Sequence, residues 1–435
     1  MRKMCVQAER VLWVACPVIM FVAMFAHMTA LENMALGLVG IGTLAAAFSP
    51  ERPSPLRWPL VLPIAAWAAW ALISVSWSPF PRDSLHAWLD EVLYPLVSFV
   101  AFWLVGTRTE RPQRIVLITW VACLLLAGGS VYYWGRLQPP TSPADLLLHY
   151  YNRVGHTSTL AIFSMTLFTG FLMDRRWRLF GLSGIVLALI IGLATLNRFF
   201  WPAAGVTLVI AAYPLYRRHM LFAAVSVLVM CVAAVGTLEL SVRLRLGHSM
   251  PKPAAREVTV AGDTMYMPEA LAGIGDAMSS DTRPKLWAFY GREGEAHTWT
   301  GVGFGKPLPG RVFQAEIPPS LLEREPQALT HAHNLFLNTW LETGIVGVVL
   351  EISLLLALIW RFWRLRHAVP WVSAAGMALA VGMIAKNSTD DFMWQTTALA
   401  FWCFSGFLMG QGEKRAGMLP KAKNGEQGKN KRNPH

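Results

Sequence analysis

The stretch THAHNLFLNTWLETGIVG, residues 330–347, joins the longest polar segment of the chain to an apolar run of membrane length. His331, His333 and Asn334 precede that run, where a helix N-terminus leaves backbone N–H groups free and favours anions. Partial desolvation and the positive end of a helix dipole favour a neutral histidine that can accept a proton. The simpler interpretation is that Asn334 or His333 only caps the helix.

The composition indicates an integral membrane protein, because 54% of the 435 residues are hydrophobic and no soluble domain is evident. The five cysteines show no short-range pairing, which argues against a disulfide framework or a zinc site. The first apolar run, residues 11–30, follows a basic start and lacks a small-residue cleavage site. We expect it to be a retained first helix.

Apolar windows of about membrane length predict an all-α protein with about twelve transmembrane helices. Residues 1–238 are expected to form helices 1–9, residues 239–343 an outer loop segment with short helices, and residues 344–410 helices 10–12. Residues 411–435 are expected to form a disordered basic cytoplasmic tail. Within the outer segment, residues 247–280 show weak periodicity, so we expect short helices and a mobile part there. The windows are 11–30, 34–48, 59–77, 91–106, 115–134, 158–173, 179–196, 202–216, 220–238, 344–360, 371–386 and 393–410.

The distribution of Lys and Arg predicts the orientation. A cytoplasmic N-terminus places 23 of the 38 basic residues in cytoplasmic turns and in the tail, and only 5 in short outer loops. The long 239–333 segment is then outside, where its charge does not count against the topology. The net charge of +12 follows from this rule and from anionic inner-leaflet lipid, so we expect contact with inner membrane lipids and no nucleic-acid partner.

Transport is disfavoured by two observations. The sequence shows no strong internal repeat of the kind found in secondary transporters. We also expect no buried acidic residue in the middle of a span, because the nearest candidates, Asp390 and Asp391, lie at the outer end of the eleventh span.

Arg198 lies in a short outer turn between two spans and is followed by Phe199, Phe200 and Trp201. A guanidinium among aromatic residues at membrane depth is costly and often marks a ligand site. The alternative is an arginine whose side chain reaches outer-leaflet headgroups.

In the outer segment, Arg283 and Trp287 precede the glycine motif GVGFG at residues 301–305. Glycines allow close backbone approach to a ligand, but the motif alone is weak and no Walker lysine follows. We therefore expect no ATP or dinucleotide, and an ordinary turn is the alternative.

Another outer loop, residues 135–157, is rich in side chains that bind sugar hydroxyls or phosphate, although a solvated loop has the same composition. The polar residues of interest are Arg136, Asp145, His149, Tyr150, Tyr151, Asn152, Arg153 and His156. The His331 and His333 pair does not predict a metal site, because no further ligands are spaced nearby and the two rings would diverge on a helix.

Together these motifs resemble the O-antigen ligases, within the larger group of O-antigen ligases, O-antigen polymerases and protein O-oligosaccharyltransferases. The resemblance covers roughly residues 150–410, and the order of the motifs is more specific than any one of them. Phe199 replaces the small residue common after the first arginine, and Thr300 replaces a frequent proline. The matching residues are Asn197, Arg198, Arg283, Trp287, Gly301, Gly303, Gly305, His333, Asn334, Gly344 and Gly347.

The resemblance implies a glycosyltransferase of the C-type membrane fold. Such an enzyme transfers polysaccharide from undecaprenyl diphosphate to the lipid A-core at the periplasmic face of the bacterial inner membrane, inverting the anomeric carbon, without a metal or another cofactor. Arg198 and Arg283 are expected to neutralise the leaving diphosphate, and His333 to act as the base. Asp390 or Asp391 is expected to orient the base or an arginine. The residues expected to bind substrate are Arg153, Asn334, His331, Trp287, Gly303, Asp390, Asp391, Arg136 and His156.

Four alternatives stay open. An O-antigen polymerase would use similar residues with a lipid-linked acceptor, and a protein O-oligosaccharyltransferase would be longer, with an added outer domain. A lipid-linked saccharide flippase or exporter would form no bond, and a scaffold in envelope assembly would tolerate loss of all the candidate residues.

Overall fold

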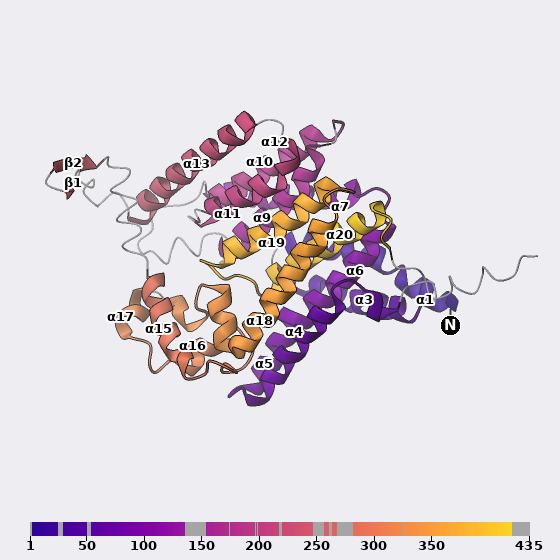
Figure 1. The fold of residues 1–435 in the computed structure, drawn as a ribbon, viewed down its shortest axis with the longest axis horizontal. Helices are drawn as coiled ribbons and strands as arrows, with labels where there is room; N and C mark the ends of the chain where they lie inside the picture. The colour runs from indigo at the N-terminus through magenta and orange to yellow at the C-terminus, as the bar shows by residue number, and fades with distance from the viewer. Residues whose placement is uncertain are drawn as a thin grey trace, which may run out of the picture.

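The computed structural model describes residues 2–24, 29–49, 54–134, 154–173, 175–195, 197, 199–216, 220–246, 256–260, 263–267, 282–324 and 326–419. Over these residues the chain is helical apart from one two-stranded hairpin (Figure 1). Arg136, Arg153, Arg198 and the tail from residue 420 lie outside the described residues. The elements are α1 (Arg2–Glu9), α2 (Leu12–Met24), α3 (Thr29–Phe48), η1 (Pro55–Arg57), α4 (Val61–Ser74), η2 (Val75–Trp77), α5 (Pro81–Trp88), the π-helix η3 (Leu89–Leu93), α6 (Tyr94–Arg108), α7 (Gln113–Trp134), α9 (Val154–Phe171), α10 (Arg178–Ala194), α11 (Phe200–Ala211), α12 (Tyr213–Tyr216), α13 (Met220–Leu246), β1 (Arg256–Val260), β2 (Asp263–Met267), α15 (Arg283–Glu295), α16 (Leu308–Val312), α17 (Pro319–Arg324), η4 (Pro326–Leu329), α18 (Leu335–Arg364), α19 (Pro370–Asn387) and α20 (Gln395–Arg415).

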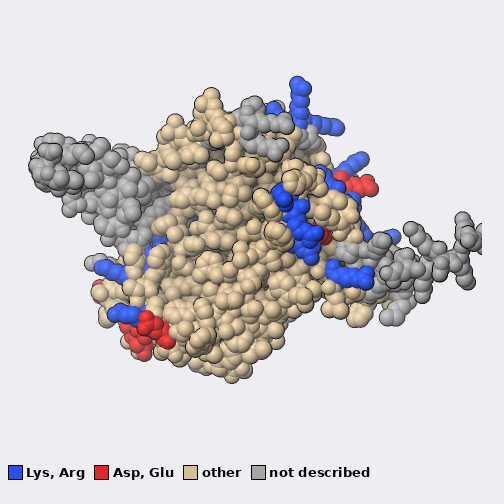
Figure 2. Space-filling view, in the orientation of Figure 1, with Lys and Arg blue, Asp and Glu red and all other residues tan. Residues whose placement is uncertain are grey.

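The apolar helices have the length and composition of membrane spans. Among the described residues, four stretches are long and apolar enough to cross a bilayer, namely Met4–Ala23, Thr29–Phe48, Pro81–Arg108 and Leu335–Arg364. Shorter apolar helices coincide with several other predicted windows. Figure 2 shows a broad surface without charge between charged side chains at the two ends of the molecule. These features agree with an all-α membrane protein, whereas the number of twelve spans stays a prediction.

The helices α6 and α20 form the most extensive helix pair, and glycines bring them together. A Cβ atom on Gly406 would lie 2.2 Å from the carbonyl oxygen of Phe99, and one on Gly410 would lie 2.4 Å from that of Trp103. From the other helix, a Cβ atom on Gly106 would lie 2.7 Å from a backbone oxygen of α20. Small residues four apart permit such close backbone contact in membrane helices, where packing replaces the hydrophobic effect.

The outer segment forms a second apolar cluster beside the first turns of α18 (Figure 1). The short helices expected between residues 239 and 343 are present as α15, α16 and α17. Within residues 247–280, however, the described residues form the antiparallel hairpin of β1 and β2, with Arg256 opposite Met267. The expectation of short helices is wrong there, because the strands REVTV and DTMYM are rich in β-branched and aromatic residues.

The close packing of α6 on α20 gives a testable consequence for stability. We expect Gly406→Val to lower the free energy of unfolding by about 1–3 kcal/mol, because the added methyls meet backbone atoms that cannot move aside. The matched control is Gly40→Ala in α3, where an added Cβ meets nothing within 4 Å. Thermal unfolding in detergent measures both, and equal midpoints for the two variants would contradict the packing argument.

Candidate active site

The helix α18 begins directly after Asn334, whose side chain closes its N-terminus. Its Oδ1 accepts a hydrogen bond of 3.0 Å from the N–H of Leu337, and its Nδ2 donates to the carbonyl of Ser388 at 2.9 Å. The cap considered from the sequence is thus present. His333, one residue earlier, has a φ of +54°, a left-handed conformation that residues other than glycine rarely adopt. Strain of this kind must be held by surrounding contacts and gathers at functional sites.

His331 and His333 are both buried, and their ring centroids lie 4.1 Å apart. We expected the rings to diverge on a helix, and this was wrong because α18 starts only at Leu335. Burial and the neighbouring His333 lower the pKa of His331 well below its usual range, so His331 is neutral at pH 7. Its Nδ1 lies 2.8 Å from Oγ1 of Thr330, and its Nε2 makes no hydrogen bond to any described residue.

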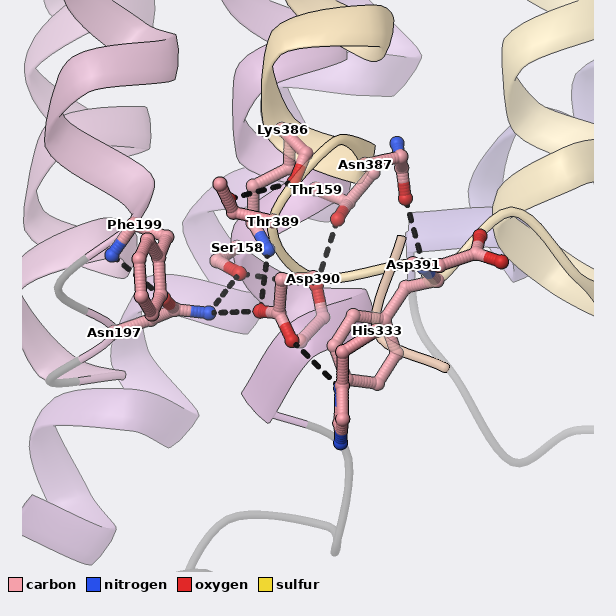
Figure 3. A network of polar contacts seen from close by, with 12 residues as sticks. Ser158, Thr159, Asn197, Phe199, His333, Lys386, Asn387, Thr389, Asp390 and Asp391 are labelled. Carbon is pink, nitrogen blue, oxygen red and sulfur yellow. Dashed lines mark hydrogen bonds and ion pairs between the residues drawn. The ribbon is translucent and has the colours of Figure 1, made fainter. Parts of the chain in front are cut away.

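Asp390 is the centre of the polar network in Figure 3. Its Oδ1 lies 3.3 Å from Nη2 of Arg283 and 3.6 Å from Nδ1 of His333. Its Oδ2 lies 2.6 Å from Nζ of Lys386 and accepts a hydrogen bond of 3.0 Å from Nδ2 of Asn197. Burial alone would raise the pKa of this carboxyl, but the nearby Lys386, His333 and Arg283 together hold it well below its usual range. Asp390 is therefore a buried anion that holds a histidine and an arginine in place.

Asn197 connects the turn before α11 to the same network. Its Nδ2 also donates to Oγ of Ser158 at 3.2 Å, and its Oδ1 accepts a hydrogen bond of 3.0 Å from the N–H of Phe199. The ring of Phe199 lies under Arg283, whose Cζ is 4.1 Å from the ring centroid in a cation–π contact. Both chain neighbours of Arg198 thus belong to the site.

A second buried network joins the segment after the glycine motif to α18. Nζ of Lys306 lies 2.6 Å from Oδ2 of Asp391. Glu342 accepts a hydrogen bond of 3.0 Å from the N–H of Gly305 and another from the side-chain amide of Asn338. Burial would lower the pKa of Lys306, but Asp391 and Glu342 raise it above its usual range, so the lysine stays charged.

The backbone of Ala332, between the two histidines, is held from two helices. Its N–H donates to Oδ1 of Asn338 on α18 at 3.1 Å, and its carbonyl accepts a hydrogen bond of 2.9 Å from Nε1 of Trp287 on α15. These two contacts fix the segment that carries the strained His333, which explains how the left-handed conformation is maintained.

Two acidic residues lie inside α18, which is long and apolar enough to span a membrane. Glu342 is buried, and Glu351 accepts a hydrogen bond of 2.7 Å from Oγ1 of Thr339. Our expectation that no span carries a buried acidic residue is therefore wrong. Both carboxylates face protein groups that donate hydrogen bonds, so they avoid the cost of contact with lipid.

The glycine motif docks on α18. Gly301, Gly303 and Gly305 have φ values of +66°, +114° and +133°. The N–H of Gly303 donates to the carbonyl of Glu342 at 2.9 Å, and a Cβ on Gly301 would lie 2.4 Å from the carbonyl carbon of the same residue. The helix is interrupted here, at Gly344, with a φ of +69°. The motif uses its glycines for backbone contact with a broken helix, and two of its N–H groups are occupied by Glu342.

Most of the predicted site residues that the structure describes lie together, whereas Arg136, Arg153 and Arg198 are outside the described residues. Asp391 pairs with Lys306 in the second buried network, and Gly303 donates a hydrogen bond to Glu342 of α18 rather than to the Asp390 network. His156, at the start of α9, accepts a hydrogen bond of 2.8 Å from Nε1 of Trp394, whose ring centroid is 5.8 Å from that of His331. The predicted residues that share one site are His331, His333, Asn334, Arg283, Trp287 and Asp390.

Sequence reasoning missed Lys386, Lys306 and Trp394 as parts of this region. Lys386 was counted only for orientation, although a lysine at the end of an apolar run, four residues before Asp390, can pair with it on a helix. Trp394 lies at the start of the last apolar window, a position typical of a tryptophan at the membrane interface, and no sequence signal places it between His156 and His331. Lys306 follows the glycine motif directly, but its partner Asp391 is too distant in sequence to be inferred.

Comparison with known proteins gives two similarities. Residues 146–352 match the family model described as O-antigen ligase. Over 334 residues the chain is 25% identical to a protein named O-antigen ligase from Pseudomonas aeruginosa, covering 75% of this chain and 70% of that protein. The range matched by the family model contains His333 and Arg283. The resemblance inferred from the motifs is confirmed by the two similarities.

The Asp390 network predicts a specific pattern of stability. We expect Asp390→Ala to destabilise the fold by about 3–5 kcal/mol, because it leaves Lys386 buried without its carboxylate. Adding Lys386→Met should recover much of this loss, since neither charge then remains. Asp83→Ala is the control, because its bridge to Arg311 is exposed and should contribute less than about 1 kcal/mol. Thermal unfolding measures all three, and a double variant no more stable than Asp390→Ala would contradict the pairing.

The lowered pKa of His331 predicts how stability changes with pH. In acid, the unfolded chain binds a proton at this histidine that the folded chain does not, so stability falls as the pH drops below about 6.5. We expect His331→Gln to reduce this acid-induced loss, whereas His297→Gln, at an exposed position, should leave it unchanged. The unfolding midpoint measured from about pH 7.5 to 5 tests this, and parallel profiles for wild type and His331→Gln would contradict it.

Proposed function

We propose, from the two matches that support a member of the O-antigen ligase family, that the chain is a glycosyltransferase. It transfers polysaccharide from undecaprenyl diphosphate to a hydroxyl of the lipid A-core. The observation that carries the proposal is the convergence of His333, Arg283 and Asn197 on one buried carboxylate, Asp390. Asn197 and Phe199 are the chain neighbours of Arg198, and the Phe199 ring lies under Arg283. The three candidate catalytic residues come from separate parts of the chain, and each has a partner in the same network or is adjacent to one.

The base in this proposal is His333. An acceptor hydroxyl must lose its proton as its oxygen attacks the anomeric carbon, and a histidine within hydrogen-bond reach can take it. With Nδ1 turned toward Asp390, Nε2 is the nitrogen that receives the proton. The carboxylate then stabilises the imidazolium that forms and fixes the ring orientation.

The leaving group in this proposal is the diphosphate, which takes up the negative charge as the glycosidic bond breaks. Arg283, which is partly exposed, and Arg198 would bind it, because a planar guanidinium matches the geometry of phosphate oxygens. Lys386 has no exposed surface and is held by Asp390, so we assign it to the support of the site rather than to the ligand. Fixed cations can replace a metal here, and in-line attack inverts the anomeric carbon.

The membrane arrangement belongs to the same proposal. Twelve spans in the C-type glycosyltransferase fold, with both termini cytoplasmic, would place α15, α16 and the start of α18 on the periplasmic side of the inner membrane. The four long apolar stretches and the uncharged surface between two charged ends in Figure 2 support this placement. The first nine spans would then end near residue 238, although α13 itself runs on to Leu246.

Two other functions predict different outcomes. A polymerase would accept a lipid-linked glycan instead of the lipid A-core. A flippase is the function that acidic residues inside α18 would favour, but Glu342 and Glu351 both accept hydrogen bonds from protein groups. A transport path would need polar groups that are free to bind the moving charge, whereas these two acidic side chains are already held by protein donors.

The decisive experiment is a transfer assay with purified protein, undecaprenyl-diphosphate-linked glycan, lipid A-core and excess chelator. We expect wild type to transfer glycan. His333→Ala should lose roughly 10²–10⁴-fold in rate, because general base catalysis contributes about that much. Arg283→Ala should lose at least about 10²-fold, the typical effect of removing one group that stabilises developing charge.

The matched controls are His297→Ala and Arg292→Ala, which remove the same residue types from exposed positions of the same outer segment and should keep full activity. Extension of lipid-linked glycan without transfer to lipid A-core would favour the polymerase. If the protein moves the donor across liposome membranes and His333→Ala is fully active in this assay, the flippase function replaces the enzymatic one. The anomeric configuration of the product, read by NMR, tests inversion.

A further inference from the structure

A cavity of about 190 Å³ lies beside the candidate active site, between α5, the π-helix η3, the segment after the glycine motif and the start of α20. Its walls combine acidic, amide and aromatic side chains. The residues used below are Asp83, Asp90, Glu91, Arg311, Trp394 and Gln395.

The cavity is close to the candidate base. Trp394 in its wall lies 5.8 Å, between ring centroids, from His331, which lies 4.1 Å from His333. Gly305, also in the wall, is followed by Lys306, which binds Asp391. The cavity therefore approaches the site from the side of Asp391.

The cavity and the proposed diphosphate site lie on different sides of Asp390. Figure 3 shows Asn197 and Phe199 on one side of Asp390, and His333 and Asp391 on the other. Arg198 is bonded to Asn197 and Phe199 in the chain, and Arg283 lies over the Phe199 ring. His333, the proposed base, therefore lies between the two arginines and the cavity. This is the arrangement that the reaction requires, because the donor and the acceptor must bind on opposite sides of the reacting atoms.

Several polar groups in the wall have hydrogen-bonding capacity that the protein does not use. Asp90 and Gln395 are exposed to solvent and Glu91 is partly buried, and none of the three makes a side-chain hydrogen bond to a described residue. Asp90 and Glu91 are carried by a π-helix, and Gln395 has a φ of +44°. Polar groups at a cavity wall that lack partners bind water or a ligand, and both kinds of backbone irregularity gather at functional sites.

The charge of the wall decides the class of ligand. Asp83, Asp90 and Glu91 line the wall, and its one guanidinium, of Arg311, already lies 2.6 Å from Asp83. A phosphate at this wall would meet acidic side chains and a cation that is already paired, in contrast to the arginine side of the site. A metal ion is not favoured either, because no group of three or more His, Cys, Asp or Glu among the described residues converges to hold one.

The chemistry that remains is a neutral, hydroxyl-rich ring. Carboxylate and amide oxygens accept hydrogen bonds from hydroxyls, and the aromatic ring of Trp394 offers an apolar surface for the C–H face of a sugar. We propose that this cavity is an acceptor subsite that binds a neutral sugar of the core oligosaccharide, next to the sugar that is glycosylated. The inference rests on the proposed function, because it assigns the binding site of the acceptor in the same reaction.

The test compares steady-state kinetics of wild type, Asp90→Asn and Gln395→Gly, where glycine removes the side chain without adding backbone strain at a positive φ. We expect each variant to raise the acceptor KM by about tenfold, the effect of losing one good hydrogen bond, while kcat and the donor KM stay within about twofold. Glu316→Gln and Gln314→Gly, at exposed positions of the outer segment away from the cavity wall, are the matched controls and should leave both KM values unchanged.

A binding measurement separates this proposal from the proposed function. Saturation-transfer NMR with the neutral, dephosphorylated core oligosaccharide should show binding to wild type that both variants weaken, and the phosphorylated form should bind less well. If wild type binds the neutral oligosaccharide in this way but transfers nothing, the cavity stands and the ligase function fails. If wild type transfers glycan while both variants keep the wild-type acceptor KM, the subsite is wrong. A rise in the donor KM instead, or preference for the phosphorylated form, equally overturns it.

Discussion

The burial of one carboxylate, Asp390, is the constraint on which the site depends. A buried anion is tolerated only with compensating charge and hydrogen bonds, and here Lys386, Arg283, Asn197 and His333 supply them. These groups come from α19, α15, the turn before α11 and the segment before α18. Lys386 lies only four residues before Asp390, so the fold must bring the other three parts of the chain to this point, and each of these three places a candidate catalytic group or the neighbour of one.

Electrostatic preorganisation follows from the same arrangement. Asp390 keeps its negative charge because its partners hold the pKa well below the usual range, even though burial opposes this. A carboxylate that is already charged and fixed can orient His333 and stabilise its protonated form without rearrangement during the reaction. The strained backbone at His333 is also preorganised. The hydrogen bonds of Ala332 with Asn338 and Trp287 hold this conformation without a bound substrate.

Sequence reasoning reached the helical membrane class and the residues with strong local signals. His333 and Asn334 were found because polar residues before an apolar run mark a helix start, and Arg283 because it belongs to a motif. What sequence reasoning could not find are partners distant in the chain. Nothing local pairs Lys306 with Asp391, and the strands of the β1 and β2 hairpin are too short to give a periodic signal.

The two consecutive aspartates connect the candidate catalytic groups to the rest of the outer segment. Asp390 holds His333, while Asp391 holds Lys306, which follows the glycine motif docked on the break in α18. Because neighbouring residues in one short loop serve both networks, we expect a displacement of the glycine segment to move the carboxylate beside His333. The wall of the acidic cavity belongs to that same segment through Gly305. A sugar bound in the cavity would therefore contact the segment that is linked to the loop of Asp390. In the proposed reaction, acceptor binding would then also align His333.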